Sequence, residues 1–137
     1  LGRDAAAIRT ARQVLALDPA DADTAHHLGQ LLFDGKQYPA AVAALKQAAA
    51  SPRLVSPARR LGVARDLARA AEAGDDYATA EAALRDALAI LAERKDDLLS
   101  AGPFASPAEY HREVGTVHEH LGKALAARKK LPDAVAA

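Results

Sequence analysis

Apolar side chains recur at spacings of three and four residues along most of the chain, which is the pattern of helices with one buried face. No segment shows the alternation of polar and apolar positions that is typical of strands. The spacing predicts helices over about 3–17, 22–34, 39–50, 57–74 and 77–99, another from 106 to beyond 125, and the first turn of a seventh from Leu131. We therefore expect an all-α fold of about six to seven antiparallel helices.

Capping residues support several of these boundaries. Ser56 followed by Pro57 is a helix cap with a proline in the first turn, where a missing N–H does no harm. Ser106 with Glu109 three residues later forms a capping box. Gly35 is expected to close the helix over 22–34.

The chain also repeats itself. Residues 28–44 align without gaps on 121–137, and nine of the 17 positions are identical. A third copy begins 39 residues after the first. In it, Ala25, Leu28, Gly35, Tyr38, Ala41, Ala44, Leu45 and Ala48 return as Ala64, Leu67, Gly74, Tyr77, Ala80, Ala83, Leu84 and Ala87.

This pattern resembles the tetratricopeptide repeat (TPR), a helix-turn-helix unit with Leu-Gly in helix A, an aromatic residue near the start of helix B, then Ala-x-x-x-Phe and a closing Pro. The best copy reads Ala25-x-x-Leu28-Gly29-x-x-Leu32, then Tyr38, Ala41-x-x-x-Leu45, Ala48 and Pro52. The resemblance implies an α-solenoid, a right-handed superhelix of stacked helix pairs. It covers nearly the whole chain.

In this reading residues 1–137 are a single TPR-like domain, which we expect to be a piece of a longer protein. Residues 1–20 resemble helix B of a preceding repeat and 21–52 a full repeat. Residues 56–99 resemble a repeat with an elongated helix B, and 106–137 a repeat truncated in helix B. Small residues such as Gly29, Ala41 and Ala80 would allow neighbouring helices to approach closely, while Leu45 and Leu84 fill the space between them.

Composition excludes several functional classes. The 137 residues contain no Cys, which excludes disulfides, thiolate zinc sites and cysteine nucleophiles. Lys and Arg number 18 against 18 Asp and Glu, so a nucleic-acid binder that depends on excess positive charge is not expected. No run approaches the roughly 18 apolar residues of a membrane helix, so we expect no membrane partner. The compartment stays open, with the cytoplasm favoured.

Neither catalysis nor metal binding is expected. The five histidines, His26, His27, His111, His118 and His120, lack the three- or four-residue spacing that places two ligands on one helix face. His27 and His120 occupy the same repeat position. The four serines form no G-x-S-x-G motif, and no phosphate-binding loop is present. We therefore predict no enzyme activity and no cofactor.

The resemblance implies a ligand surface on the concave face, formed by outward positions of each helix A. Of these positions, seven are the predicted peptide-binding residues: His26, Gln30 and Phe33 in the first full repeat, Arg65 and Arg69 in the second, and Glu119 and Lys123 in the third. Asp23, Asp34, Glu72 and Thr116 occupy further positions of the same surface. Arg65 and Arg69 lie one turn apart, an arrangement suited to a carboxylate or an acidic peptide. The alternative is that they pair with Glu72 and Asp66 on a solvated helix face.

We thus predict a non-catalytic scaffold that holds a protein or peptide segment, expected to be acidic, in this groove. One alternative is a regulatory or accessory TPR segment of a larger multidomain enzyme, with its contacts made in cis. Another is a self-assembling module, a homo-oligomer formed through the exposed terminal helices.

Overall fold

The computed structural model describes residues 2–100 and 102–129, and in these ranges the chain forms seven helices and no strand. They are α1 (Gly2–Leu17), α2 (Ala22–Asp34), α3 (Tyr38–Ala50), α4 (Pro57–Ala73), α5 (Tyr77–Glu93), α6 (Lys95–Ser100) and α7 (Pro107–Lys129). The all-α prediction is confirmed for this part of the chain. The helix expected from Leu131 lies outside the described residues.

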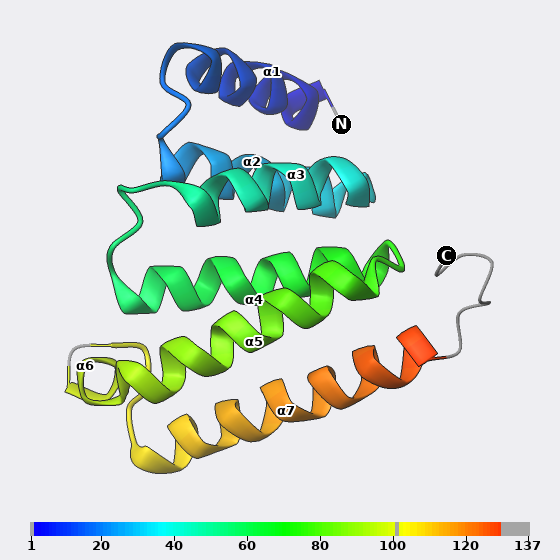
Figure 1. Cartoon of the computed structure of the whole chain (residues 1–137). Coiled ribbons are helices and arrows are strands. Elements are labelled where there is room, and N and C mark those ends of the chain that lie inside the picture. Colours follow the sequence, from blue (N-terminus) through cyan, green and yellow to red (C-terminus); the bar gives the residue numbers. More distant parts are fainter. Residues whose placement is uncertain (1, 101, 130–137) are drawn as a thin grey trace.

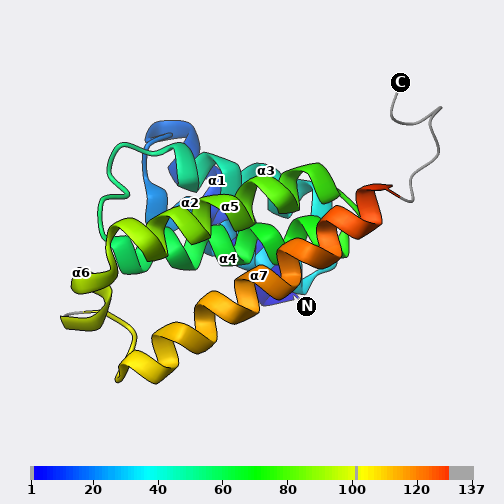
Figure 2. The same cartoon turned by 60° about the horizontal axis from the view of Figure 1, so that its bottom comes forward.

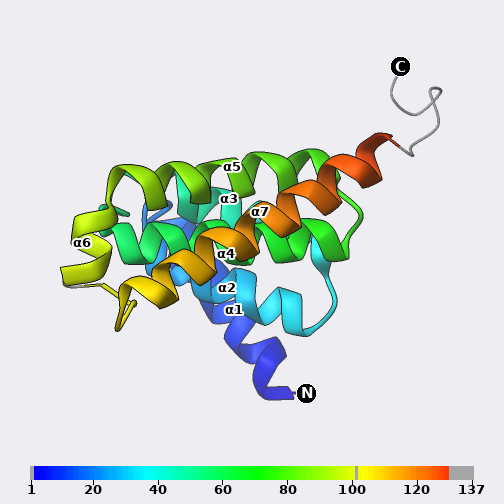
Figure 3. The same cartoon turned by 90° about the horizontal axis from the view of Figure 1, so that it is seen from below.

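Each long helix packs against the next one along the chain, from α1 on α2 through to α5 on α7 (Figure 1). Seen from below, α3 and α5 lie on one side and α2 and α4 on the other, and α7 runs obliquely across α4 and α5 (Figures 2 and 3). Within the described ranges, no helix is long and apolar enough to cross a membrane.

Very small side chains occupy the contacts between consecutive helices. Ala41 and Ala80 are both 0% exposed. A Cβ atom built on Gly29 would lie 2.5 Å from Cγ of Leu45, itself buried in α3. The α2 and α3 backbones therefore approach closely because Gly29 has no side chain, and Leu45 fills the space that results.

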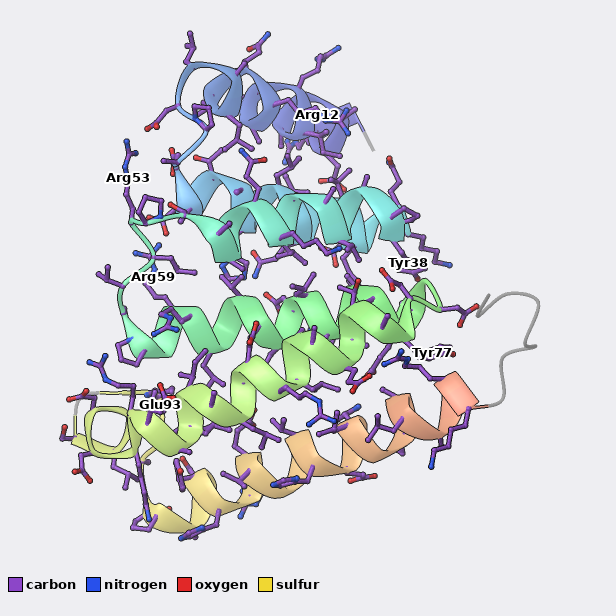
Figure 4. The ribbon with its side chains drawn as sticks, viewed as in Figure 1. Arg12, Tyr38, Arg53, Arg59, Tyr77 and Glu93 are labelled. Atoms are coloured by element: carbon purple, nitrogen blue, oxygen red, sulfur yellow. The ribbon has the colours of Figure 1, made fainter. Side chains whose placement is uncertain are left out.

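Two of the loops are tied together at one end of the molecule. Arg53 Nη1 lies 2.5 Å from Oδ2 of Asp18, and the Ser51 hydroxyl donates a 2.6 Å hydrogen bond to the Ala20 carbonyl. Arg53 is labelled at this end in Figure 4. These contacts fix the turn between α1 and α2 against the loop between α3 and α4.

Side chains at both ends of α7 hold it antiparallel to α5. The buried Tyr110 hydroxyl donates a 2.6 Å hydrogen bond to the Leu91 carbonyl near the end of α5. Arg128, in the last turn of α7, is ion-paired with Glu81 in the second turn of α5. The predicted capping box starts α7, since Glu109 N–H donates to Ser106 Oγ at 3.3 Å. In a capping box the Glu109 carboxylate would accept from the N–H of Ser106. Here it accepts from the N–H of the preceding residue, Ala105, at 2.8 Å.

The prediction of one helix over 77–99 is wrong. The α5 helix ends at Glu93, Arg94 has a φ of −118°, and α6 begins at Lys95. The apolar stripe ends after Leu91, where charged residues follow. The break between α5 and α6 places Leu98 in the core, where it is 0% exposed. Asp96 and Asp97 consequently lie in the first turn of α6, where the helix dipole favours acidic side chains.

The turns inside the two helix pairs α2–α3 and α4–α5 share one backbone conformation. The glycines that end α2 and α4 keep negative φ values, −81° at Gly35 and −93° at Gly74. The positive φ, 60°, falls on the next residue, Lys36 or Asp75. Tyr38 and Tyr77, which follow these turns, lie at the same end of the molecule (Figure 4). A Cβ atom built on Gly74 would lie 3.0 Å from the Cβ atom of Tyr38. The absence of a side chain at Gly74 therefore lets the end of α4 approach the start of α3 closely.

The tight contact at Gly29 gives a stability prediction. We expect Gly29→Ala to lower the free energy of unfolding by about 1–3 kcal/mol, because the added methyl would overlap the buried Leu45 side chain. Gly62→Ala, also within a helix but with no atom within 4 Å of the built Cβ, is the matched control. It should raise stability by about 0.5–1 kcal/mol. Urea denaturation followed by circular dichroism measures both, and equal effects would contradict the close-contact explanation.

Candidate functional site

Three helices that run in the same chain direction, α2, α4 and α7, carry the predicted site residues, and α7 crosses obliquely beside the other two (Figures 1 and 3). The surface that they form is here named the α2–α4–α7 face. Side-chain contacts link these helices in matching order along their lengths. From α2 to α4 the contacts are Asp23–Arg59, His26–Asp66 and Phe33–Arg69, and from α4 to α7 they are Arg65–Glu113 and Glu72–His120. The face is therefore continuous across the three helices.

Asp66 of α4 is the centre of a polar cluster between α2 and α4. Its Oδ2 atom lies 2.7 Å from Nε2 of His26 and accepts a 3.2 Å hydrogen bond from Nε2 of Gln30. The side chain of Asp66 is 24% exposed. Two side chains of α2 thus converge on one half-buried carboxylate of α4, and they fix the alignment of the two helices.

These contacts change the acidity of Asp66. Burial by itself raises the pKa of a carboxyl group, but the hydrogen bonds from His26 and Gln30 and the positive charges of His26 and Arg69 act in the opposite direction. The net result is a lowered pKa for Asp66. The carboxylate stays ionised and able to accept both hydrogen bonds to a lower pH than an ordinary aspartate.

Arg69 lies one turn after Asp66 and makes a different kind of contact. Its guanidinium carbon is 5.0 Å from the centroid of the Phe33 ring, a cation–π arrangement, and its side chain is 65% exposed. The nearest carboxylate oxygen is Oδ1 of Asp66, at 3.8 Å. A cavity of about 240 Å³ opens beside the pair. Its lining is Gly29, Gln30, Phe33, Asp34, Leu45, Asp66 and Arg69.

A smaller cavity, of about 90 Å³, lies between α4 and α7. Two ion pairs bound it: Arg65 Nε is 3.0 Å from Oε1 of Glu113, and His120 Nδ1 is 3.4 Å from Oε2 of Glu72. The other oxygen of Glu72 is buried and has no hydrogen-bond partner. Leu84 of α5 contributes an apolar wall.

The structure brings four of the seven predicted site residues together: His26, Gln30, Phe33 and Arg69 surround Asp66 and the larger cavity. Arg65 and Arg69 have partners on opposite sides of α4, one on α7 and one on α2. The alternative prediction was that the two arginines pair with Asp66 and Glu72 on a solvated helix face. It agrees with the structure for Arg69, which lies near Asp66, but not for Arg65, which pairs with Glu113.

The remaining two predicted residues, Glu119 and Lys123, pair with each other. Their charged groups are 3.1 Å apart along the exposed side of α7, and neither residue lines the two cavities described above.

Sequence reasoning named Asp66 only as an alternative partner of the two arginines, not as the carboxylate that receives His26 and Gln30, and it missed Glu113. The spacing of Asp66, three residues before Arg69, places both on one helix face and was the available signal. For Glu113 only the packing of α7 against α4 shows its role.

The histidines at equivalent repeat positions both face the preceding part of the chain. His27 lines a cavity with Ala7, Thr10 and Val14 of α1, and His120 faces α4. In the described part of the chain, no group of three or more histidine or acidic side chains is placed to hold a metal ion.

Comparison of the chain with protein-family models, with curated proteins and with solved structures finds no match. What can be inferred about function therefore depends on the repeat residues and on the geometry of the α2–α4–α7 face.

The lowered pKa of Asp66 makes a pH-dependent contribution to stability that a substitution can isolate. A carboxyl group whose pKa is lower in the folded state stabilises above its unfolded-state pKa, and this contribution is lost as the pH falls through the folded-state value. We expect Asp66→Asn to cost about 1–2 kcal/mol at pH 7. The deficit relative to the wild type should shrink below about pH 4.

Urea denaturation between pH 3 and pH 7 measures this difference. The control is Asp86→Asn, at an exposed position of α5. A deficit for Asp66→Asn that grows on acidification below pH 4 would show that the sign is wrong.

Proposed function

We propose that this chain is a TPR-like α-solenoid and a non-catalytic scaffold that binds a protein or peptide segment on the α2–α4–α7 face. The solenoid interpretation is supported by the packing of consecutive helices and by the burial of the small repeat residues Ala41 and Ala80 at 0% exposure. It is supported also by the common chain direction of α2, α4 and α7 (Figure 1). A stack of this kind presents equivalent helices of successive units on one surface.

The observation that carries the binding proposal is the Arg69–Phe33 pair beside the larger cavity. Arg69 has most of its side chain exposed and only a distant carboxylate neighbour, while Phe33 supplies an apolar wall. A guanidinium group binds carboxylates strongly and with defined geometry. The pair therefore suits a segment that offers an acidic side chain next to an apolar one.

The dimensions of the face suit a short extended segment. Directly packed helix axes lie about 8–10 Å apart, and α2, α4 and α7 are linked by side chains across a wider spacing, so a path from α2 across α4 to α7 spans at least roughly 20 Å. An extended chain needs about six residues or more to cover that distance. We propose recognition and not turnover, because the polar side chains at the centre of the face are bonded to one another: His26 and Gln30 to Asp66, and Arg65 to Glu113.

A peptide-display selection tests the binding proposal. Random seven-residue peptides selected on the immobilised wild-type protein should be enriched in Asp and Glu next to an apolar residue. Fluorescence polarisation then gives the affinity of a selected peptide. We expect Arg69→Glu to weaken this affinity by about tenfold or more, because an attractive charge-assisted contact with the acidic peptide becomes a repulsion.

Arg60→Glu is the matched control. Arg60 lies on the same helix but lines a cavity with α3 and α5 residues, away from the α2–α4–α7 face. It should change the affinity by less than about twofold. A selection that enriches no acidic sequence, or equal losses for the two variants, would refute this assignment.

A further inference from the structure

A groove lies between α3 and α5, which run in the same chain direction on the side of the molecule opposite α2 (Figures 1 and 3). Two adjoining cavities, of about 480 Å³ and 170 Å³, form it. They share four lining residues: Ala49 of α3, Leu67 of α4, and Ala83 and Asp86 of α5. The two cavities are therefore one continuous surface feature, here named the α3–α5 groove.

The walls of the α3–α5 groove are made of very small side chains, and Leu67, which is 8% exposed, lies at its floor. Five exposed alanines line the walls: Ala49, Ala50, Ala78, Ala82 and Ala89. The outer face of a solvated helix usually carries charged or polar side chains. Side chains this small allow another helix to approach closely, as Gly29 does for the helix that carries Leu45.

Charged side chains of opposite sign border the groove. Asp86 and Glu93 come from α5, and Glu93 is labelled at the end of that helix in Figure 4. Lys46 comes from α3 and Arg60 from α4. All four are exposed, and within the described ranges none of them forms an ion pair. Their charges are therefore available to a partner.

We propose that the α3–α5 groove binds one amphipathic helix of a partner protein. The bulky apolar side chains of this helix face the alanines, its acidic edge lies beside Lys46 and Arg60, and its basic edge lies beside Asp86 and Glu93. The inference goes beyond the proposed function, because the groove shares no lining residue with the two cavities of the α2–α4–α7 face.

The length of the groove sets the length of the partner helix. Glu93 lies 15 positions after Ala78 on α5, which corresponds to about 22 Å at 1.5 Å per residue. A partner helix of about four turns covers this distance. Asp86 and Glu93 are seven positions apart, or about two turns, so basic residues at positions i and i+7 of the partner would lie beside them. Apolar anchors at i, i+3 or i+4, and i+7 would then face the alanines.

A helix suits this groove better than a second copy of the chain. Because the wall side chains end at Cβ, the occupant must supply the bulk that fills the space, and a row of leucines on one helix face does so. A second copy related by a two-fold axis would place its own groove against this one, and the alanines of both would lack contacts. The opposite charges of the two sides then set the direction of the bound helix.

A selection of helical peptides provides the first test. Sixteen-residue helices displayed on phage, with one face and its two edges randomised, are selected on the wild-type protein and depleted on Ala82→Arg. We expect enrichment of bulky apolar residues on the face, with acidic residues on one edge and basic residues on the other.

Fluorescence polarisation of a selected helix, synthesised with a fluorescein label, then measures its affinity. Ala82→Arg should weaken binding by about tenfold or more, because the arginine occupies space that the partner's apolar side chains need. The matched control is Ala92→Arg, at an exposed position of α5 that does not line the groove. It should change the affinity by less than about twofold.

The second test reverses the charges that α5 contributes. We expect Asp86→Lys/Glu93→Lys to weaken binding of the selected helix by about three- to tenfold. A version of that helix with Glu on both edges should bind this variant more tightly than it binds the wild-type protein. The control, Asp4→Lys/Asp96→Lys, makes the same change in net charge at exposed positions of α1 and α6 and should have less than about a twofold effect.

Four results would overturn the inference. The first is a selection that enriches no sequence over the Ala82→Arg protein, and the second is an equal effect of the two charge reversals. The third is unchanged affinity when a central residue of the selected helix is replaced by proline, since the occupant would then be an extended segment. The fourth is a wild-type dimer in sedimentation velocity that Ala82→Arg dissociates, which would assign the groove to a second copy.

The acidic-segment site is tested separately, so the two proposals can fail independently. Arg69→Glu should leave the affinity of the selected helix within about twofold of the wild-type value, because Arg69 does not line the groove. A loss of about tenfold would instead place the helix on the α2–α4–α7 face and overturn the inference. Failure of the acidic-peptide selection alone would overturn the proposed function and leave the groove assignment in place.

Discussion

The close approach of consecutive helices at very small side chains is the constraint on which the rest of this structure depends. Gly29 leaves room for the Leu45 side chain, and Ala41 and Ala80 are completely buried. Close-packed contacts of this kind tolerate little added volume, so they fix the distance and alignment of each helix against the next. Once the alignment is fixed, the polar side chains that project from α2, α4 and α7 meet at definite positions.

The chemistry of the α2–α4–α7 face follows from this alignment. Half-buried charges need partners, and here each partner comes from the adjacent helix: Asp66 receives His26 and Gln30, and Glu113 receives Arg65. Arg69 is the exception, because it rests on the Phe33 ring and retains most of its exposure. The internal pairs hold the helices in place, and in our proposal the exposed guanidinium group of Arg69 is the group that contacts the partner.

Local sequence signals located helices well and failed where a tertiary contact overrode them. The bounds of α2 agree with the predicted 22–34, because a clear apolar stripe and a closing glycine mark that segment. The predicted helix over 77–99 is instead divided at Arg94, because burial of Leu98 required the chain to turn. A charged run is compatible with helix, loop or break, and only the position of the core distinguishes them.

By itself the sequence determined the all-α class, most of the helix bounds and the internal repeat of residue types, because each depends on spacing within a few residues. The tertiary structure decided the partners: Glu113 for Arg65, Phe33 for Arg69, and a carboxylate for His26 but not for His27. These pairings join residues up to 48 positions apart, and they depend on the crossing and register of whole helices. No pattern within one helix encodes that geometry.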